Sequence, residues 1–216
     1  MNAELQPEYL IRYVSPEDTN VAASLLYQAY HDDPILRNVL GDKDEQKFEA
    51  KLRALIREEL SSFGQGQQPM IGLYEDDRLR AIACLIEADS ELQAARYWHW
   101  RLRLMMSAGY LQTQALIDKE QAIRDALAQK GHYFFLAFIA VDPHVHGQGF
   151  GRTLMRGLEE MIADVPAASG IGVFITNPDH QAFFHHLGYE VFQTLAFNKI
   201  RGELMFKATD KSETAL

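Results

Sequence analysis

One stretch of sequence indicates both the fold and the chemistry of this chain: Val141-Asp142-Pro143-His144-Val145-His146-Gly147-Gln148-Gly149-Phe150-Gly151-Arg152. It follows an apolar run, 133–141, which predicts a central strand covered on both faces. It leads into a helix expected over 151–163. Glycines without a Cβ let main-chain N–H groups approach an anion closely, and a helix N-terminus adds unpaired donors. We therefore expect this loop to hold a diphosphate.

The spacing of the glycines separates this loop from two other nucleotide-binding loops. Gly147, Gly149 and Gly151 do not fit Gly-x-Gly-x-x-Gly, and no acidic residue follows at the distance that a dinucleotide ribose requires. The stretch also lacks the Gly-Lys-Ser/Thr of a nucleoside-triphosphate loop. A tight turn with close helix packing remains the structural alternative for these glycines.

Length and composition predict one soluble domain, 1–216. The chain has 216 residues, 47% of them hydrophobic and 24% charged, and a net charge of −9. An acidic chain without a basic block argues against a nucleic-acid partner or an anionic membrane partner, and it favours cationic ligands. The single cysteine fits a reducing compartment, and the N-terminus lacks a signal peptide, so we expect a cytoplasmic protein.

Local patterns predict an alternating order of strands and helices. Strands are expected at 10–14, 70–74, 79–88, 133–141, 170–176, 190–197 and 203–207. Helices are expected at 16–33, 43–63, 151–163 and 179–187, with two more in a helical insert at about 90–130. This order predicts an α/β fold with a mixed sheet and helices on both faces.

The glycine loop resembles the signature of the GNAT superfamily of acyl-CoA-dependent N-acyltransferases. That signature is a strand ending near Val-Asp-Pro, followed by Gln/Arg-x-x-Gly-x-Gly/Ala. Here it begins at His146, where the family usually has Gln or Arg. A second family segment also matches, from Asn177 to Leu187-Gly188-Tyr189, and the order of elements agrees from about residue 10 to 207. The insert is similar to that of the small-molecule branch that includes puromycin acetyltransferase-like proteins.

The resemblance implies a GNAT-like, mostly antiparallel mixed sheet with helices on both faces and a two-helix insert. Strand 133–141 would splay from strand 170–176, and the pantetheine of acetyl-CoA would lie in the opening. The Val141 N–H would polarise the thioester carbonyl, a contribution of about 2.7–4 kcal/mol. The implied cofactor-binding residues are Ile139, Ala140, Val141, His146, Gly147, Gln148, Gly149, Phe150, Gly151, Arg152 and Asn177.

The usual catalytic acid and base of the family are both replaced. Phe184 stands where many members have a tyrosine acid, and Gly172 stands where a glutamate base is common. We predict His132, which titrates near neutral pH, and Glu87, near a strand end, as the groups that bind or deprotonate the amine. The structural alternatives are a cap where the strand begins for His132 and a solvated strand end for Glu87.

The sequence thus predicts transfer of an acetyl group from acetyl-CoA to the primary amine of a small molecule, by direct attack in a ternary complex. Trp98 and His99, in the insert, are expected to bind the substrate, with core or lid packing as the alternative. No metal is expected, and a homodimer is compatible with the resemblance. The alternative function is a non-catalytic acyl-CoA-binding regulatory or interaction module.

Overall fold

A seven-stranded sheet forms the centre of the molecule. The computed structural model describes residues 8–41, 43–88, 110–197 and 200–209, with the side chains of 110–113 excepted. The strand order in the sheet is β1-β2-β3-β4-β5-β7-β6. The strands are β1 (Tyr9–Tyr13), β2 (Met70–Glu75), β3 (Arg78–Glu87), β4 (Phe134–Val141), β5 (Gly170–Ile175), β6 (Glu190–Phe197) and β7 (Ile200–Ala208).

The helices begin and end close to the residues that the sequence indicates, with one addition. They are α1 (Thr19–Tyr30), α2 (Pro34–Leu40), α3 (Glu45–Gln65), α5 (Tyr110–Leu127), α6 (Phe150–Ala163) and α7 (Pro178–His186). The sequence pattern predicted a helix that ends at Asp33 and no helix over Pro34–Leu40, so α2 is an addition. Asp33 and Pro34 begin that helix, because Asp33 Oδ1 accepts the Leu36 N–H at 2.9 Å and proline suits the first helical position.

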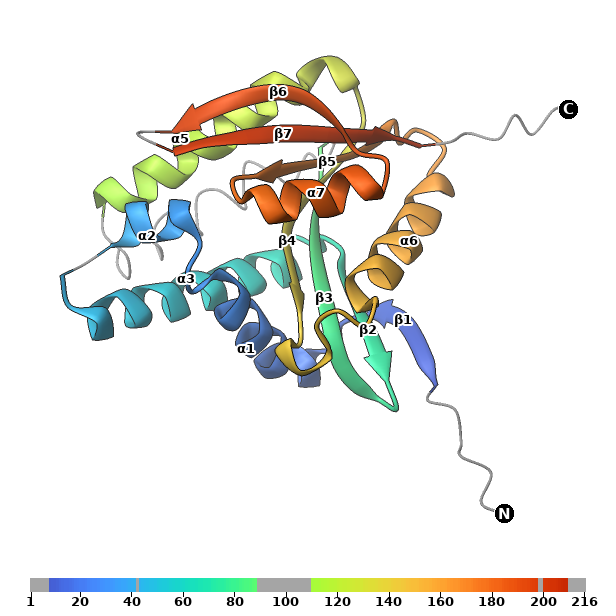
Figure 1. Ribbon diagram of the computed structural model, residues 1–216, viewed down its shortest axis with the longest axis horizontal. Coiled ribbons are helices and arrows are strands. Elements are labelled where there is room, and N and C mark those ends of the chain that lie inside the picture. The colour runs from blue at the N-terminus through green and yellow to red at the C-terminus, as the bar shows by residue number, and fades with distance from the viewer. Residues whose placement is uncertain (1–7, 42, 89–109, 198–199, 210–216) are drawn as a thin grey trace, which may run out of the picture.

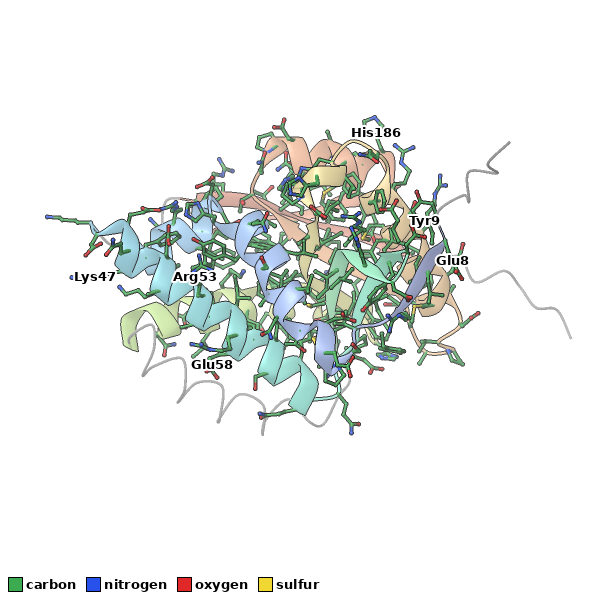
Figure 2. All side chains as sticks on the ribbon, turned by 90° about the horizontal axis from the view of Figure 1, so that it is seen from below. Glu8, Tyr9, Lys47, Arg53, Glu58 and His186 are labelled. Carbon is green, nitrogen blue, oxygen red and sulfur yellow. The ribbon has the colours of Figure 1, made fainter. Side chains whose placement is uncertain are left out.

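Both faces of the sheet are covered, as expected. Along β3, Ile82 and Cys84 pack with α1, α2 and α3, whereas Ala81 and Ala83 face α6. In Figure 2, Glu58 on α3 and His186 on α7 lie at opposite edges of the molecule, so these two helices cover opposite faces. None of the helices in the described ranges has the length and apolar character needed to cross a membrane.

The sheet divides between β4 and β5, its one parallel pair within the described chain. Phe134, Phe135 and Leu136 pair with Ile171, Gly172 and Val173, and the pairing ends there. β4 nevertheless continues beside β3 as far as Val141. Figure 1 shows β3 and β4 running down the view while β5, β6 and β7 run across it. The mixed, mostly antiparallel sheet predicted from the sequence is therefore confirmed.

Candidate active site

The divergence of β4 from β5 coincides with a cavity of about 1010 Å³. Its lining includes the second half of β4, the glycine loop and the end of β5. It also includes residues of α1, α2, α3 and α5 on one face of the sheet and residues of α6 and α7 on the other. The cavity therefore reaches both faces of the sheet through the opening between the two strands.

The glycine loop lines this cavity. Gly147 and Gly149 have φ values of +78° and +89°, which residues with a Cβ rarely adopt. A Cβ built on either glycine meets no atom within 4 Å, so it would project into open space. Gly149 is the N-cap of α6 without a side-chain cap, and the first N–H groups of a helix have no intrahelical acceptor. The loop therefore fits a diphosphate group.

Asp142 fixes the backbone where β4 ends and the loop begins. Its Oδ1 accepts the His144 N–H at 2.9 Å, and its Oδ2 accepts Arg80 Nη1 at 2.8 Å. Burial alone would raise the pKa of Asp142, but the hydrogen bonds from His144 and Arg80 outweigh it and hold the pKa below its ordinary value. The carboxylate is thus ionised at neutral pH.

His146 turns back onto the end of β4. Its Nε2 donates to the Val141 carbonyl oxygen at 3.0 Å. This bond accounts for a histidine where the family usually has Gln or Arg, since the side chain ties the loop to the strand.

The main-chain N–H groups of β4 alternate between its two edges. Asp142 donates to the Arg80 carbonyl of β3 at 2.7 Å. Ile139 instead donates to the hydroxyl of Tyr30, at 3.1 Å. Because neighbouring N–H groups of a strand point in opposite directions, Ile139 and Val141 both turn away from β3. Both line the cavity, where an extended ligand could pair with them as a strand would.

Tyr30 is the last residue of α1 and also lines the cavity. Its ring makes an edge-on contact with Phe138, with 5.3 Å between the ring centroids. Burial raises the pKa of Tyr30, although the hydrogen bond from Ile139 opposes this effect. The phenol is therefore protonated at neutral pH.

Asn177 and Arg152 border the cavity from the two helices on the glycine-loop side. Asn177 caps α7, because its Oδ1 accepts the Asp179 N–H at 2.9 Å. Arg152 is exposed in the first turn of α6.

The structure brings two of the predicted catalytic residues, His132 and Glu87, together, but far from the third, Val141. His132 Nε2 donates to Glu87 Oε1 at 2.8 Å, and neither residue lines the cavity. Glu87 is in register with Phe134, at the start of β4. Val141 is seven residues farther along the strand, or about 23 Å at roughly 3.3 Å per residue. The geometry therefore fits the structural alternative for His132, a tie where the strand begins.

Packing explains the two departures from the family pattern. The Phe184 side chain is 2% exposed, and its ring contacts Phe183 and Tyr189 at centroid distances of 5.1 and 5.2 Å. A Cβ on Gly172 would lie 2.9 Å from Leu127 Cδ1, so a larger residue there would require the Leu127 side chain to shift. Neither position can transfer a proton in this chain.

Glu59 is a cavity residue that the sequence analysis missed. It lies on α3, is 8% exposed, and is the one buried charged residue in the described part of the chain. A signal was present in the sequence, because Glu59 interrupts the apolar stripe that runs through Leu52, Leu55 and Phe63 at helical spacing. A charge at such a position is unusual unless it has a partner or a function.

One group of side chains within the described ranges has the spacing of metal ligands, namely His31, Glu45 and Glu49. Arg37 Nη1 donates to Glu45 at 2.9 Å, so a cationic side chain already contacts this group. The predicted substrate-binding residues Trp98 and His99 lie outside the described residues.

Comparison with protein families supports the resemblance stated above. A model described as an Acetyltransferase (GNAT) domain matches residues 113–191, which include the glycine loop and Asn177. No curated protein sequence matches the chain. The predicted resemblance to GNAT acetyltransferases is confirmed by the domain match together with the fold. The assignment to the puromycin acetyltransferase-like branch stays a prediction.

Several solved structures share the fold. A histone acetyltransferase HPA2-related protein from Corynebacterium glutamicum has a TM-score of 0.68 and 16% identity, over 94% of this chain and 96% of that one. An agmatine N-acetyltransferase has a TM-score of 0.61 and 14% identity, over 93% and 99%. The Drosophila melanogaster polyamine N-acetyltransferase has a TM-score of 0.59 and 14% identity, over 92% and 98%. At these identities the likeness shows the fold.

Proposed function

We propose that this chain, in which residues 113–191 match the GNAT acetyltransferase domain, is an N-acetyltransferase that moves an acetyl group from acetyl-CoA to the primary amine of a small molecule. One observation carries the proposal: the glycine loop, the unpaired edge of β4 and a set of acidic side chains line the same cavity. A donor and an acceptor that enter from opposite faces of the sheet can therefore meet inside it, as direct attack in a ternary complex requires.

The donor side of the cavity is the glycine loop and the edge of β4. We assign the pyrophosphate to the N–H groups between Gly147 and Arg152, and the pantetheine arm to Ile139, Val141 and Asn177. Acetyl-CoA supplies an activated acyl carbon: the amine nitrogen bonds to it, the carbon–sulfur bond breaks with its electron pair on sulfur, and the proton lost by nitrogen balances the thiolate.

We assign the role of polarising the thioester carbonyl to the N–H of Ile139 and not, as the sequence predicted, to that of Val141. Val141 adjoins the loop that would hold the pyrophosphate, whereas an extended pantetheine arm carries the thioester away from that loop along β4. Ile139 presents the next N–H on the same edge, about 6.6 Å farther along. A donor of this kind contributes roughly 2.7–4 kcal/mol to the transition state. Val141 then serves a pantetheine amide.

The acceptor side of the cavity is acidic. Among the described residues on that side, the carboxylates of Asp32, Asp33, Glu59 and Glu120 line it, together with the ammonium group of Lys119. This balance favours a cationic amine, and the agmatine and polyamine acetyltransferases of the same fold are consistent with that class. We propose that Glu59, the buried member, accepts the proton of the attacking amine, since a general base adds about 10²–10⁴-fold in rate.

The test is thiol release from acetyl-CoA with a panel of diamines, guanidino-amines, arylalkylamines and neutral amines, alongside calorimetry with CoA. We expect turnover that is fastest for the dications. CoA binding without release on any amine would favour the non-catalytic acyl-CoA-binding module, which the replaced acid and base at Phe184 and Gly172 motivate. Absence of CoA binding would overturn both functions. The cytoplasmic location, the homodimer and the exclusion of nucleic-acid and membrane partners stay predictions.

A further inference from the structure

We propose that the hydroxyl of Tyr30 is a second hydrogen-bond donor to the thioester carbonyl, beside the N–H of Ile139. This inference rests on the proposed function. It adds a catalytic group from α1, an element outside the glycine loop and outside the family signature segments on which the resemblance was based.

The hydrogen bond that the Tyr30 hydroxyl accepts from Ile139 shows where the hydroxyl lies. Tyr30 Oη lies 3.1 Å from the Ile139 nitrogen, on the edge of β4 that β5 has left. An oxygen that accepts from this N–H lies where a carbonyl oxygen on the same N–H would lie. A carbonyl oxygen that docks on Ile139 therefore displaces the Tyr30 oxygen from this position and leaves the hydroxyl next to it, within hydrogen-bond reach.

The hydroxyl has a proton left to donate. A tyrosine O–H donates one hydrogen bond while its oxygen accepts others. Within the described part of the chain, the bond recorded for this hydroxyl is the one that it accepts from Ile139. When the carbonyl oxygen takes over the Ile139 N–H, the hydroxyl can turn from acceptor to donor toward that same oxygen.

The surroundings of Tyr30 suit a neutral donor next to Ile139. The edge-on contact with Phe138 holds the ring, and α1 packs directly on β4. Burial raises the pKa of Tyr30, so the hydroxyl keeps its proton throughout the neutral range. It would act by donating a hydrogen bond to the negative charge that develops on the oxygen, without giving up the proton.

The test compares two ligands that differ in the carbonyl oxygen. Binding of acetyl-CoA and of S-ethyl-CoA, a thioether with the same two carbons and no carbonyl, is measured by calorimetry for the wild type and Tyr30→Phe. We expect Tyr30→Phe to weaken acetyl-CoA binding about 2- to 10-fold and to leave S-ethyl-CoA binding unchanged. The kcat for an amine should fall further, by about 10²-fold, because the charge on oxygen is largest in the transition state.

Tyr74→Phe is the matched control. Tyr74 is also buried and its hydroxyl donates to Asp18 at 2.8 Å, but it does not line the cavity. Its removal should leave the ratio of the two affinities unchanged, and a thermal melt checks that both variants fold.

The other outcomes overturn the inference in distinguishable ways. Tighter acetyl-CoA binding by Tyr30→Phe would mean that the hydroxyl only competes for the Ile139 N–H. Equal changes for both ligands would mean that the residue only shapes the cavity. If the wild type binds neither ligand, the proposed function itself is overturned and this inference with it.

Discussion

Two hydrogen bonds join Arg80 on β3 to Asp142, the residue that follows β4. Arg80 Nη1 donates to Asp142 Oδ2 at 2.8 Å, and the Asp142 N–H donates to the Arg80 carbonyl at 2.7 Å. Glu75 accepts the Arg80 Nε–H at 3.0 Å from the neighbouring strand, so the guanidinium spans three strands. The sheet therefore fixes the position of Asp142, where the glycine loop begins.

This contact makes part of the stability depend on pH. The pKa of Asp142 lies below its usual 3.8, because hydrogen bonds from His144 and Arg80 outweigh the opposing effect of burial. A carboxyl with a lowered folded pKa contributes stability that is present above about pH 4 and lost as the pH falls through the folded value. We expect Asp142→Asn to lower the free energy of unfolding at pH 7 by about 1–3 kcal/mol, and with it the melting temperature, and to lose less stability on acidification than the wild type.

Melting temperatures between pH 7 and pH 3 test this expectation. Asp118→Asn, at an exposed position of α5, is the control and should follow the wild type. If acidification lowers the melting temperature of Asp142→Asn as much as that of the wild type, the expectation is contradicted.

Gly149 should be needed both for its backbone conformation and for its small size. Gly149→Ala forces a Cβ into a conformation with φ of +89°, at roughly 1–2 kcal/mol, and Gly149→Glu also places a negative charge beside the pyrophosphate. We expect Gly149→Glu to weaken CoA binding by at least about tenfold. Gly131→Ala, at φ +70° outside the cavity, is the control, because it carries similar strain without touching the ligand. Equal CoA affinity in all these variants would refute the diphosphate assignment.

Glu59→Gln should separate chemistry from donor binding. The amide has nearly the same shape but cannot accept the proton, so we expect kcat to fall by about 10²–10⁴-fold with acetyl-CoA affinity unchanged. Glu58→Gln, the neighbouring position on α3 (Figure 2), does not line the cavity and should keep wild-type turnover. Unchanged kcat in a folded Glu59→Gln protein would show that another group or water takes the proton.

The pair His132 and Glu87 should contribute to stability and not to turnover. The 2.8 Å contact lies at the Phe134 end of β4, about 16 Å along the strand from Ile139, so we expect His132→Ala to lower the free energy of unfolding by about 1–2 kcal/mol and to change kcat less than twofold. Denaturant unfolding and steady-state kinetics on one preparation measure both quantities. Lost turnover in a fully folded variant would return this pair to the catalytic role that the sequence suggested.

Several features could be predicted from local sequence because their causes are local. The apolar run on both faces of β4 and the glycines at positive φ depend on neighbouring residues alone, and so do the first turn of α6 and the cap at Asn177. The missed α2 has a local cause too. Asp33 and Pro34 end one helix and begin the next, and a pattern of apolar positions does not separate these two effects.

The residues that we propose to be catalytic could not be predicted in the same way. Tyr30 meets Ile139 across 109 positions of sequence, and Glu59 reaches the cavity only because α3 crosses the face of the sheet where β4 and β5 part. The sequence indicated His132 and Glu87 because their side chains can carry protons. Both lie at the start of β4, however, and neither lines the cavity.

The sequence by itself therefore determined the glycine loop, the order of the elements and the class of fold. These follow from backbone conformation and hydrophobic periodicity, which short segments carry. Only the tertiary structure decided which proton-carrying side chains lie beside the open edge of β4, because that depends on how separate helices pack over two diverging strands.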